Sequence, residues 1–383
     1  MGILSTILYI LGFTLATLIL LYIILYILSH YVFLRKNKEN RDITNRNIII
    51  TGGTSGIGKE VVKTLYLKGG VVIFTGRSLE KARAIIKGLK LDLQNLVKKR
   101  KINTQLHSTR LEDLESGTWD SEGHHFSSKY LYFRALDQSS LAEVKSFTDW
   151  FQGNFNSLDT LHCNAGLISF KDQKTQEGFD PAMGVTHFAH YLMVHELLDL
   201  LKSTPESRVV TTSSEAHSQG SSLEIDLQDF DWKKSHTKYD AMHRYGCSKL
   251  ANVLFTVGLA DFFNKKNWQV KAVSLHPGVV RTDFFRDLKG CMKVFISIFK
   301  PLLWTTWEGS QTSLFLILSP WSMLKSGEYY SRCKVATMNS RGRREAYWKK
   351  FWNVSKQEMK FKGGFDCERF EVYQLSDGRN GLE

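Results

Sequence analysis

Two residues suited to proton transfer stand at the start of an apolar stretch late in the chain. In the segment RYGCSKLANVLF, Tyr245 precedes Lys249 by four residues. Residues four apart lie on one face of a helix, so the phenol and the ammonium would be neighbours. One interpretation is a helix end whose polar tips reach solvent. The other is an acid–base pair, in which the ammonium stabilises the phenolate and lowers the tyrosine pKa towards the working pH.

A glycine-rich turn near the start of the chain predicts a phosphate site. The sequence TGGTSGIG follows a strand-like run, RNIIIT, and precedes a helix-like run. Glycines in such a turn allow a tight bend and a close backbone approach to a pyrophosphate, which the helix N-terminus then faces. The residues expected to contact the dinucleotide here are Gly52, Ser55, Gly56, Ile57 and Gly58.

The end of the second expected strand indicates which dinucleotide would bind. A site for NAD usually has an acidic residue there, which accepts hydrogen bonds from the ribose hydroxyls. This chain has Arg77 and Ser78 instead. A guanidinium suits a 2′-phosphate, so we expect NADP(H). The alternative is an exposed arginine at a strand end without a ligand.

Strand-like and helix-like segments alternate from residue 46 onward. Runs such as VVIFTG and SRVVTTSS are separated by helix-like runs of ten or more residues. This alternation predicts an α/β protein with a doubly wound parallel sheet, the Rossmann fold. Residues 102–128 depart from the alternation. They are polar, mixed in charge and long for a loop, so we expect a surface insertion there.

The N-terminal segment predicts a membrane anchor. Residues 3–29 contain no charged side chain, and a helix of that length exceeds the roughly 30 Å hydrocarbon core of a bilayer. The basic residues that follow place the main domain on the cytosolic or matrix side, at the endoplasmic reticulum or the mitochondrial inner membrane. The alternative is a buried core helix. The expected organisation is a transmembrane anchor (1–34), a basic linker (35–45), the Rossmann domain (46–355) and a tail (356–383).

The net charge of +13 indicates an anionic neighbour. A membrane surface or a phosphate-bearing ligand would satisfy it. No nucleic-acid recognition motif is present, so we expect no nucleic-acid partner.

Taken together, these motifs resemble the short-chain dehydrogenase/reductase superfamily, and within it the membrane-anchored retinol dehydrogenase-like group. The likeness runs from about residue 46 to about residue 355. It rests on the glycine turn, the Tyr245–Lys249 pair and further motifs in the same order. These are NAG at 164–166, TSSEAHS, HPGVVRT at 276–282 and EGSQTSLFLILSP.

The resemblance implies a role for each matching position. Ser214, Tyr245 and Lys249 would be catalytic, with Ser214 hydrogen-bonded to the substrate oxygen and Lys249 also to the nicotinamide ribose. Asp137 would bind the adenine amino group. The other implied cofactor contacts are Asn164, Ala165, Gly166, Pro277, Gly278, Val280 and Thr282. The implied substrate is a lipophilic carbonyl or its alcohol, retinoid-like or derived from lipid.

One position departs from the family pattern. Where the family has a stretch like VNHLGHF, this chain has VTHFAHY, with Thr186 in place of the asparagine. That asparagine helps to hold a water that links the lysine to solvent, and threonine has a shorter reach. Two functions therefore stay open. The chain is either an NADP(H)-dependent enzyme at a membrane, or a weakened or inactive relative that serves as a nucleotide-binding structural subunit of a membrane complex, such as a respiratory one.

Three further patterns concern metal binding, the substrate side of the domain and glycosylation. His187, His190 and His195 have no cysteine or carboxylate partner that would complete a metal site, so we expect no metal. Residues 290–307 are apolar with interleaved lysines, which suits either a cover over the substrate that rests on the bilayer or an ordinary buried helix. The sequence NVS at 353–355 accepts a glycan only in the secretory lumen, and the expected orientation keeps it out.

Overall fold

The computed structural model describes residues 3–27, 34–99, 104–218, 240–281 and 300–374. Thr282 and most of the segment 290–307 lie outside these residues. The side chains of residues 3–12, 15 and 16 are also outside the description.

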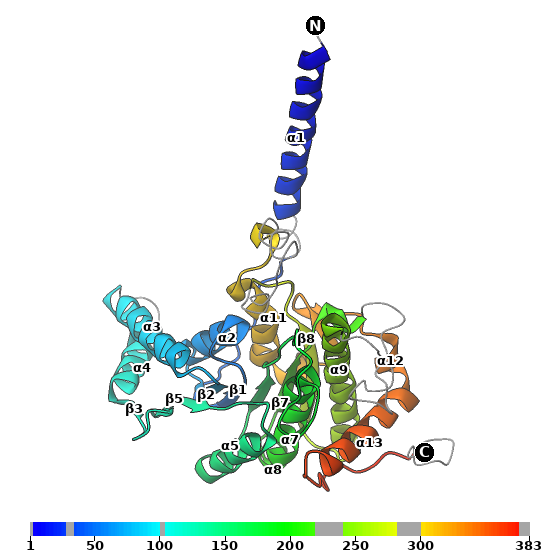
Figure 1. Ribbon diagram of the computed structural model, residues 1–383. Helices are drawn as coiled ribbons and strands as arrows, with labels where there is room; N and C mark the ends of the chain where they lie inside the picture. The colour runs from blue at the N-terminus through cyan, green and yellow to red at the C-terminus, as the bar shows by residue number, and fades with distance from the viewer. Residues whose placement is uncertain (1–2, 28–33, 100–103, 219–239, 282–299, 375–383) are drawn as a thin grey trace.

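A ten-stranded sheet forms the centre of the main domain (Figure 1). The spatial order is β10-β9-β8-β7-β6-β1-β2-β5-β4-β3. The seven mutually parallel strands are β1 (Asn47–Ile50), β2 (Val71–Gly76), β5 (Leu131–Ala135), β6 (Thr160–Cys163), β7 (Ser207–Thr212), β8 (Val270–His276) and β9 (Tyr329–Ser331). From β1 the chain first builds outward through β2 to β5, and then restarts on the other side at β6. Ligands bind at such a switch point, at the carboxyl ends of the strands.

Helices cover both faces of the sheet, which confirms the doubly wound α/β fold. Residues of β1 alternate between two cores, since Ile49 belongs to one and Ile48 and Ile50 belong to the other. The first core contains α5 (Leu141–Asn154), α7 (Ala189–Glu196), α8 (Leu198–Ser203), α9 (Ala241–Lys265) and α13 (Glu345–Phe361). The second contains α2 (Gly56–Leu67), α3 (Leu79–Lys98) and α11 (Thr306–Leu318).

The segment 102–128, expected as an insertion, extends the sheet. It contains α4 (Thr104–Ser116), β3 (Thr118–Trp119) and β4 (His125–Ser127). Strand β4 pairs antiparallel with both β3 and β5. The rings of Trp119 and Phe126, 5.6 Å apart, pack the extension against the second core. Its two- and three-residue strands are too short for a sequence pattern to reveal.

The N-terminal helix α1 (Ile3–Ile27) projects away from the main domain (Figure 1). Counting only the residues that are described, no helix is both long and apolar enough to cross a membrane.

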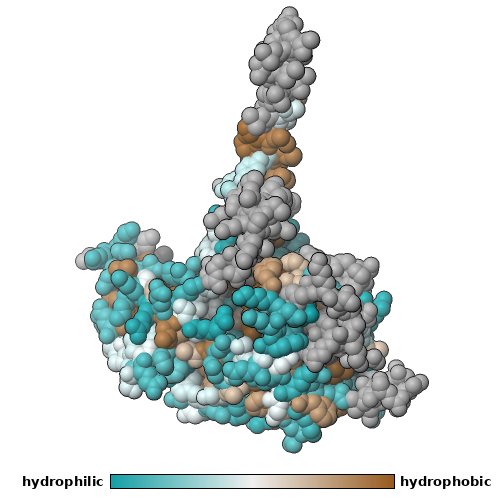
Figure 2. Space-filling view, viewed as in Figure 1, coloured by the Kyte–Doolittle hydropathy of each residue, from teal (hydrophilic) through white to brown (hydrophobic). Residues whose placement is uncertain are grey.

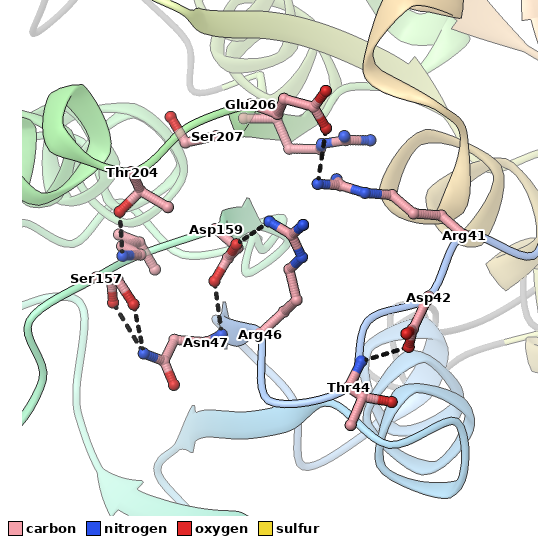
Figure 3. Close-up of polar contacts among 12 residues, drawn as sticks. Arg41, Asp42, Thr44, Arg46, Asn47, Ser157, Asp159, Thr204, Glu206 and Ser207 are labelled. Atoms are coloured by element: carbon pink, nitrogen blue, oxygen red, sulfur yellow. Dashed lines mark hydrogen bonds and ion pairs between the residues drawn. The ribbon is translucent and has the colours of Figure 1, made fainter.

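The linker that leads into β1 is fixed to the edge of the sheet at which the parallel strands begin (Figure 3). This edge lies opposite the carboxyl ends of the strands. Arg41 pairs with Glu206 at 3.1 Å, and Arg46 pairs with Asp159 at 2.7 Å. The other Asp159 oxygen accepts the backbone N–H of Asn47 at 2.9 Å. These contacts tie the linker to the turns that precede β6 and β7.

The C-terminal region continues the domain beyond residue 355. After α12 (Ser340–Arg343), helix α13 runs through that position, and Phe370 and Tyr373 are buried in the first core. The side chain of Asn353 is buried and donates to the Tyr373 carbonyl at 2.8 Å. A glycan on Asn353 would therefore disrupt this packing in the folded protein.

Candidate active site

Helix α9 carries the Tyr245–Lys249 pair on a buried face. The side chain of Asp240 begins the helix by accepting the N–H groups of Met242 and His243, both at 3.0 Å. Tyr245 is 9% exposed and Lys249 is 4% exposed. The Lys249 Nζ lies 5.6 Å from the centroid of the Tyr245 ring. Because both groups face inward, the interpretation of solvent-seeking side chains at a helix end is wrong.

Ser214 joins this pair from the end of β7. Its hydroxyl is hydrogen-bonded to the Tyr245 side chain. Ser214 precedes a short 3-10 helix, η3 (Glu215–Ser218), and its Oγ accepts the Ala216 N–H at 3.2 Å. His217 donates from Nδ1 to the Ser214 carbonyl at 2.6 Å. The structure thus brings the three expected catalytic side chains together.

Lys249 is held against the last residues of β7. Its Nζ donates to the Thr212 carbonyl at 3.1 Å, and Asn252 donates to the same oxygen at 3.0 Å. Ser213 in turn donates from Oγ to the Lys249 carbonyl at 2.7 Å. These bonds fix the depth of α9 relative to the sheet, and so the position of Tyr245 one turn earlier.

Burial sets the proton affinity of both groups. Desolvation lowers the pKa of Lys249 to about 7 and raises the pKa of Tyr245 to about 12, which the Ser214 hydrogen bond only partly opposes. The sequence predicts a lowered tyrosine pKa, and the structure differs. A lysine with a pKa near 7 is about half protonated at neutral pH, so it attracts the phenolate less than a full charge would.

Thr186 lies in a π-helical turn beside Lys249. The turn, η2 (Gly184–Phe188), joins α6 (Pro181–Met183) to α7. The Thr186 Oγ1 is buried and has no hydrogen-bond partner among the described residues. A β-carbon built on Gly166 would lie 3.3 Å from this oxygen and 2.9 Å from the Lys249 Nζ. The hydroxyl and the ammonium therefore converge on the NAG loop. Single π-helical turns are frequent at functional sites.

The NAG loop is tied to the end of β1. The Thr51 Oγ1 accepts the backbone N–H groups of Asn164 and Ala165, both at 2.9 Å. The Asn164 side chain donates to the Thr51 carbonyl at 2.9 Å. The loops that follow β1 and β6 are thus held as one unit, next to the switch point.

His190 connects this unit to the π-helical turn, a role that the sequence did not reveal. Its Nδ1 donates to the Thr186 carbonyl at 2.9 Å, so its Nε2 is an acceptor for the Thr51 hydroxyl at 2.8 Å and for Gln138 Nε2 at 3.0 Å. Burial lowers the pKa of His190 to about 4, so the ring stays neutral at physiological pH. The only signal in the sequence is the four-residue spacing from Thr186.

The glycine turn has the shape that a pyrophosphate requires. Gly52 and Gly56 have φ angles of +63° and +54°, which side-chain-bearing residues rarely adopt. A β-carbon on Gly58 would lie 2.4 Å from the Gly52 carbonyl oxygen. The Ser55 side chain makes no capping hydrogen bond to α2, which leaves the first turn of α2 open to an anion. Ile57 follows in that first turn.

The expected adenosine contacts lie at the carboxyl ends of β2 and β5. Arg77 is exposed directly after β2 and forms no ion pair with any described residue. The Ser78 side chain instead caps α3, accepting the Lys81 N–H at 3.2 Å. Asp137 follows β5, and its carboxylate accepts the Ser139 N–H at 2.9 Å. Arg77 and Asp137 share the sheet edge of the glycine turn, whereas the Ser78 hydroxyl already has a structural partner.

The loop after β8 closes the other end of the site. Gly278, which follows Pro277, has a φ of +90°, and a β-carbon there would lie 2.2 Å from the Trp304 ring. Val280 pairs with Trp304, and a β-carbon on Gly309 would lie 2.4 Å from the Val280 side chain. These close contacts place the loop between the glycine turn and the start of α11.

The three histidines of the weak metal pattern have separate partners. His187 lies 3.2 Å from the Ser355 Oγ, His190 bonds as described, and His195 lies 3.0 Å from Glu196. Within the described ranges, no three metal-ligating side chains converge.

A doubly wound sheet with a dinucleotide-type turn, and with a serine–tyrosine–lysine cluster at the same edge, defines a nucleotide-dependent oxidoreductase. A sequence profile of the short chain dehydrogenase family matches residues 46–104 and 99–225. The chain belongs to this family, and the resemblance seen in its motifs is confirmed.

Retinol dehydrogenases are among the proteins that this chain resembles in sequence. Retinol dehydrogenase 12 of Bos taurus is 31% identical over 308 residues, which cover 80% of this chain and 84% of that protein. Retinol dehydrogenase 14 of Homo sapiens is 31% identical over 326 residues, covering 84% and 88%.

Solved structures share the fold at lower identity. An uncharacterized protein from Mycobacterium paratuberculosis matches with a TM-score of 0.61 and 22% identity, covering 84% of this chain and 96% of that one. A short chain dehydrogenase from Burkholderia cenocepacia in complex with NADP matches with a TM-score of 0.52 and 19% identity, covering 76% and 97%.

Proposed function

We propose that the protein is an NADP(H)-dependent oxidoreductase that interconverts a lipophilic carbonyl compound and its alcohol at a membrane. The observation that carries this proposal is the Ser214–Tyr245 hydrogen bond beside the buried Lys249. The names of the similar retinol dehydrogenases support a retinoid-like or other lipid-derived substrate.

Each side chain of the candidate site has its own role in the proton transfer. When bound, the nicotinamide of NADP(H) supplies or accepts the hydride. Ser214 holds the substrate oxygen next to the Tyr245 hydroxyl. Burial keeps that phenol protonated at neutral pH, which is the state that donates a proton to an oxygen becoming an alkoxide. Lys249 and the Thr186 hydroxyl then return a proton towards Tyr245.

The preference for NADP(H) rests on the residues at the end of β2. Arg77 is exposed and free to meet a 2′-phosphate, and the structure has no acidic side chain at the residues that directly follow this strand. The positive-φ glycines and the uncapped first turn of α2 fit the pyrophosphate. Arg77 would confer the choice of cofactor, and the glycine turn would bind either form.

We further propose that α1 anchors the domain in a bilayer, with the domain on the cytosolic or matrix side. The helix has 25 residues and no charged side chain. Its described side chains from residue 18 to residue 27 include many exposed leucines and isoleucines, seen as brown atoms on the stalk in Figure 2. In the sequence, residues 3–29 carry no charge, and a helix over all of them would exceed the roughly 30 Å apolar core of a membrane at about 1.5 Å per residue.

The decisive test is the substitution Tyr245→Phe in the full-length protein. It should lower the rate of carbonyl reduction by about 10² to 10⁴ and leave NADPH binding nearly unchanged. The matched control is Tyr191→Phe, because Tyr191 is also buried and its hydroxyl has no hydrogen-bond partner among the described residues. NADPH oxidation with a panel of retinoid and fatty aldehydes, together with NADPH titration, measures both properties.

The same assay separates the enzyme from a structural subunit. A native chain that binds NADPH, reduces no aldehyde of the panel and co-purifies with other membrane proteins in a fixed ratio would replace the proposal with the subunit function. Turnover that Tyr245→Phe leaves intact would instead refute the assigned proton donor.

A further inference from the structure

Cationic and apolar side chains are exposed together where the linker leaves α1. Lys36 is exposed, and its Nζ lies 5.5 Å from the centre of the Trp307 ring. Trp307 lies in the first turn of α11 and is 44% exposed. A tryptophan with an ammonium at its face is a pairing that suits the interface between water and lipid.

The β9–β10 hairpin brings further exposed residues to the same place. The Cys333 Sγ, between β9 and β10 (Lys334–Val335), donates to the Arg35 carbonyl at 3.4 Å. The Cys333 N–H donates to the Thr312 Oγ1 of α11, also at 3.4 Å. Lys334 is exposed and Val335 is 41% exposed, so the hairpin tip adds a cation and an apolar side chain.

The loop after β8 borders this surface. Val279 is 57% exposed, and its carbonyl accepts the Trp304 N–H at 2.9 Å. Trp304 lies just after η5 (Lys300–Leu302), a short helix that contacts α1. Val279 is therefore bonded to the segment that directly follows η5, the short helix that contacts α1.

We propose that these residues form a docking surface for an anionic bilayer, which holds the domain against the membrane. We name this surface the α1 collar. Its members are Arg35, Lys36, Val279, Trp307, Arg332, Lys334 and Val335. The proposal rests on the membrane anchor proposed above. Its four cations complement anionic headgroups, and its tryptophan and two valines reach into the headgroup boundary.

The linker is bonded to the domain along α11, so the collar stays at the place where the chain leaves α1. The Asn37 N–H donates to the Gln311 side chain at 3.1 Å, and the Arg41 N–H donates to the Leu318 carbonyl at 3.0 Å. The linker thus follows α11 from its first turns to its end, and Ile43 is buried in the second core. Arg41 and Arg46 then fix its far end, as in Figure 3.

Docking through the collar would turn the active-site edge of the sheet towards lipid. Val279 follows Gly278 in the loop that borders the cofactor site, at the carboxyl end of β8. A lipophilic substrate would then reach the Tyr245 hydroxyl from the bilayer without crossing water.

The test uses the full-length protein in lipid nanodiscs whose lipids carry bromine near the headgroup. Bromine quenches tryptophan at close range, and the difference between the native protein and Trp307→Phe isolates Trp307. With phosphatidylserine present, most Trp307 emission should be lost, and high salt should restore it. Trp119→Phe is the control, because β3, which contains Trp119, and β10 are the two outermost strands of the sheet. The Trp119 emission, isolated in the same way, should not be quenched.

A pair of charge reversals tests the cations separately. Lys36→Glu with Lys334→Glu should restore most Trp307 emission. The control is Lys87→Glu with Lys98→Glu, the same change of charge at exposed positions of α3, and it should leave quenching as in the native protein. Equal quenching in both pairs, or none in native nanodiscs, would refute the collar. Failure of the native protein to co-elute with nanodiscs would refute the anchor instead.

Discussion

At the scale of the residue, the Thr186 hydroxyl is a buried polar group at the candidate active site that has no hydrogen-bond partner among the described residues. A buried hydroxyl without a hydrogen-bond partner costs about 1–3 kcal/mol, so a purely structural threonine would be better replaced by valine. The Thr186 Oγ1 nevertheless lies in such a position, next to Lys249 and across from Gly166. A role in proton return to Lys249 accounts for this placement.

The substitution Thr186→Val separates this role from packing. Valine has nearly the same shape, so thermal unfolding should stay unchanged or move to a higher temperature. The catalytic rate should fall, because one group of a proton pathway is lost, while the KM for NADPH stays unchanged. Thr186→Ser keeps the hydroxyl and should retain the rate. A valine variant with the native rate would show that the hydroxyl takes no part in proton return.

Arg77 is predicted to determine the choice of cofactor. A charge-assisted contact to a 2′-phosphate is worth roughly 1.5–3 kcal/mol, or about ten- to a hundredfold in affinity. Arg77→Ala should therefore weaken NADPH binding by that factor and leave NADH binding unchanged, as measured by fluorescence titration. Arg83→Ala on the exposed face of α3 is the control, because Arg83 packs on Trp119. Equal affinity of the native protein for both cofactors would contradict the assignment.

The sequence predicts the positions of the candidate site residues better than their pKa values, for physical reasons. Spacing alone places Tyr245 and Lys249 on one helix face, because helix geometry is local. Their pKa values depend on desolvation by elements that are distant in the sequence. The expected lowering of the Tyr245 pKa was wrong, because burial within the protein raises it. Ser78 was expected at the cofactor, and in the structure its Oγ also accepts the Lys81 N–H and so caps α3. The cap uses the hydroxyl as an acceptor only, so the predicted contact to a 2′-phosphate stays a prediction.

At the scale of the element, the hydrophobic pattern of residues 178–202 alone predicts one long helix. The structure divides this region into α6, a π-helical turn, α7 and α8. A hydrophobic pattern detects helical character but not one extra residue in a turn. The π-helical turn matters for function, because it places Thr186 beside Lys249 and sends its carbonyl to His190.

A pair of phenylalanine substitutions tests whether residues 356–374 are a tail or part of the domain. Phe370 is 0% exposed and its ring centre lies 4.8 Å from that of Trp352, whereas Phe361 is 80% exposed. Phe370→Ala should lower the free energy of unfolding by about 3–5 kcal/mol. Phe361→Ala should change it by less than about 0.5 kcal/mol. Denaturant unfolding in mild detergent measures both, and an effect of Phe370→Ala as small as that of Phe361→Ala would show that this segment lies outside the cooperative core.

At the scale of the whole molecule, several of the described histidines are held in the neutral form. Burial lowers the pKa of His162 and His187 to about 3 and that of His190 and His276 to about 4. They lie in or next to the central strands and the helices that hold the active site. The fold that positions the catalytic residues therefore depends on keeping these rings unprotonated.

This arrangement predicts that the protein loses stability as the pH falls from about 6.5 towards 4. Below the histidine pKa of about 6.5 in the unfolded chain, these rings are protonated in the unfolded chain but not in the folded protein. Each ring therefore lowers the free energy of unfolding by about 1.4 kcal/mol per pH unit. His187→Phe should make the fall shallower by one such increment, because the ring packs among Phe255 and Phe351. His124→Gln, at an exposed position, should leave the slope unchanged. Thermal unfolding at several pH values checks this, and a stability that stays constant from pH 6.5 to pH 5 would show that these rings are protonated inside the folded protein.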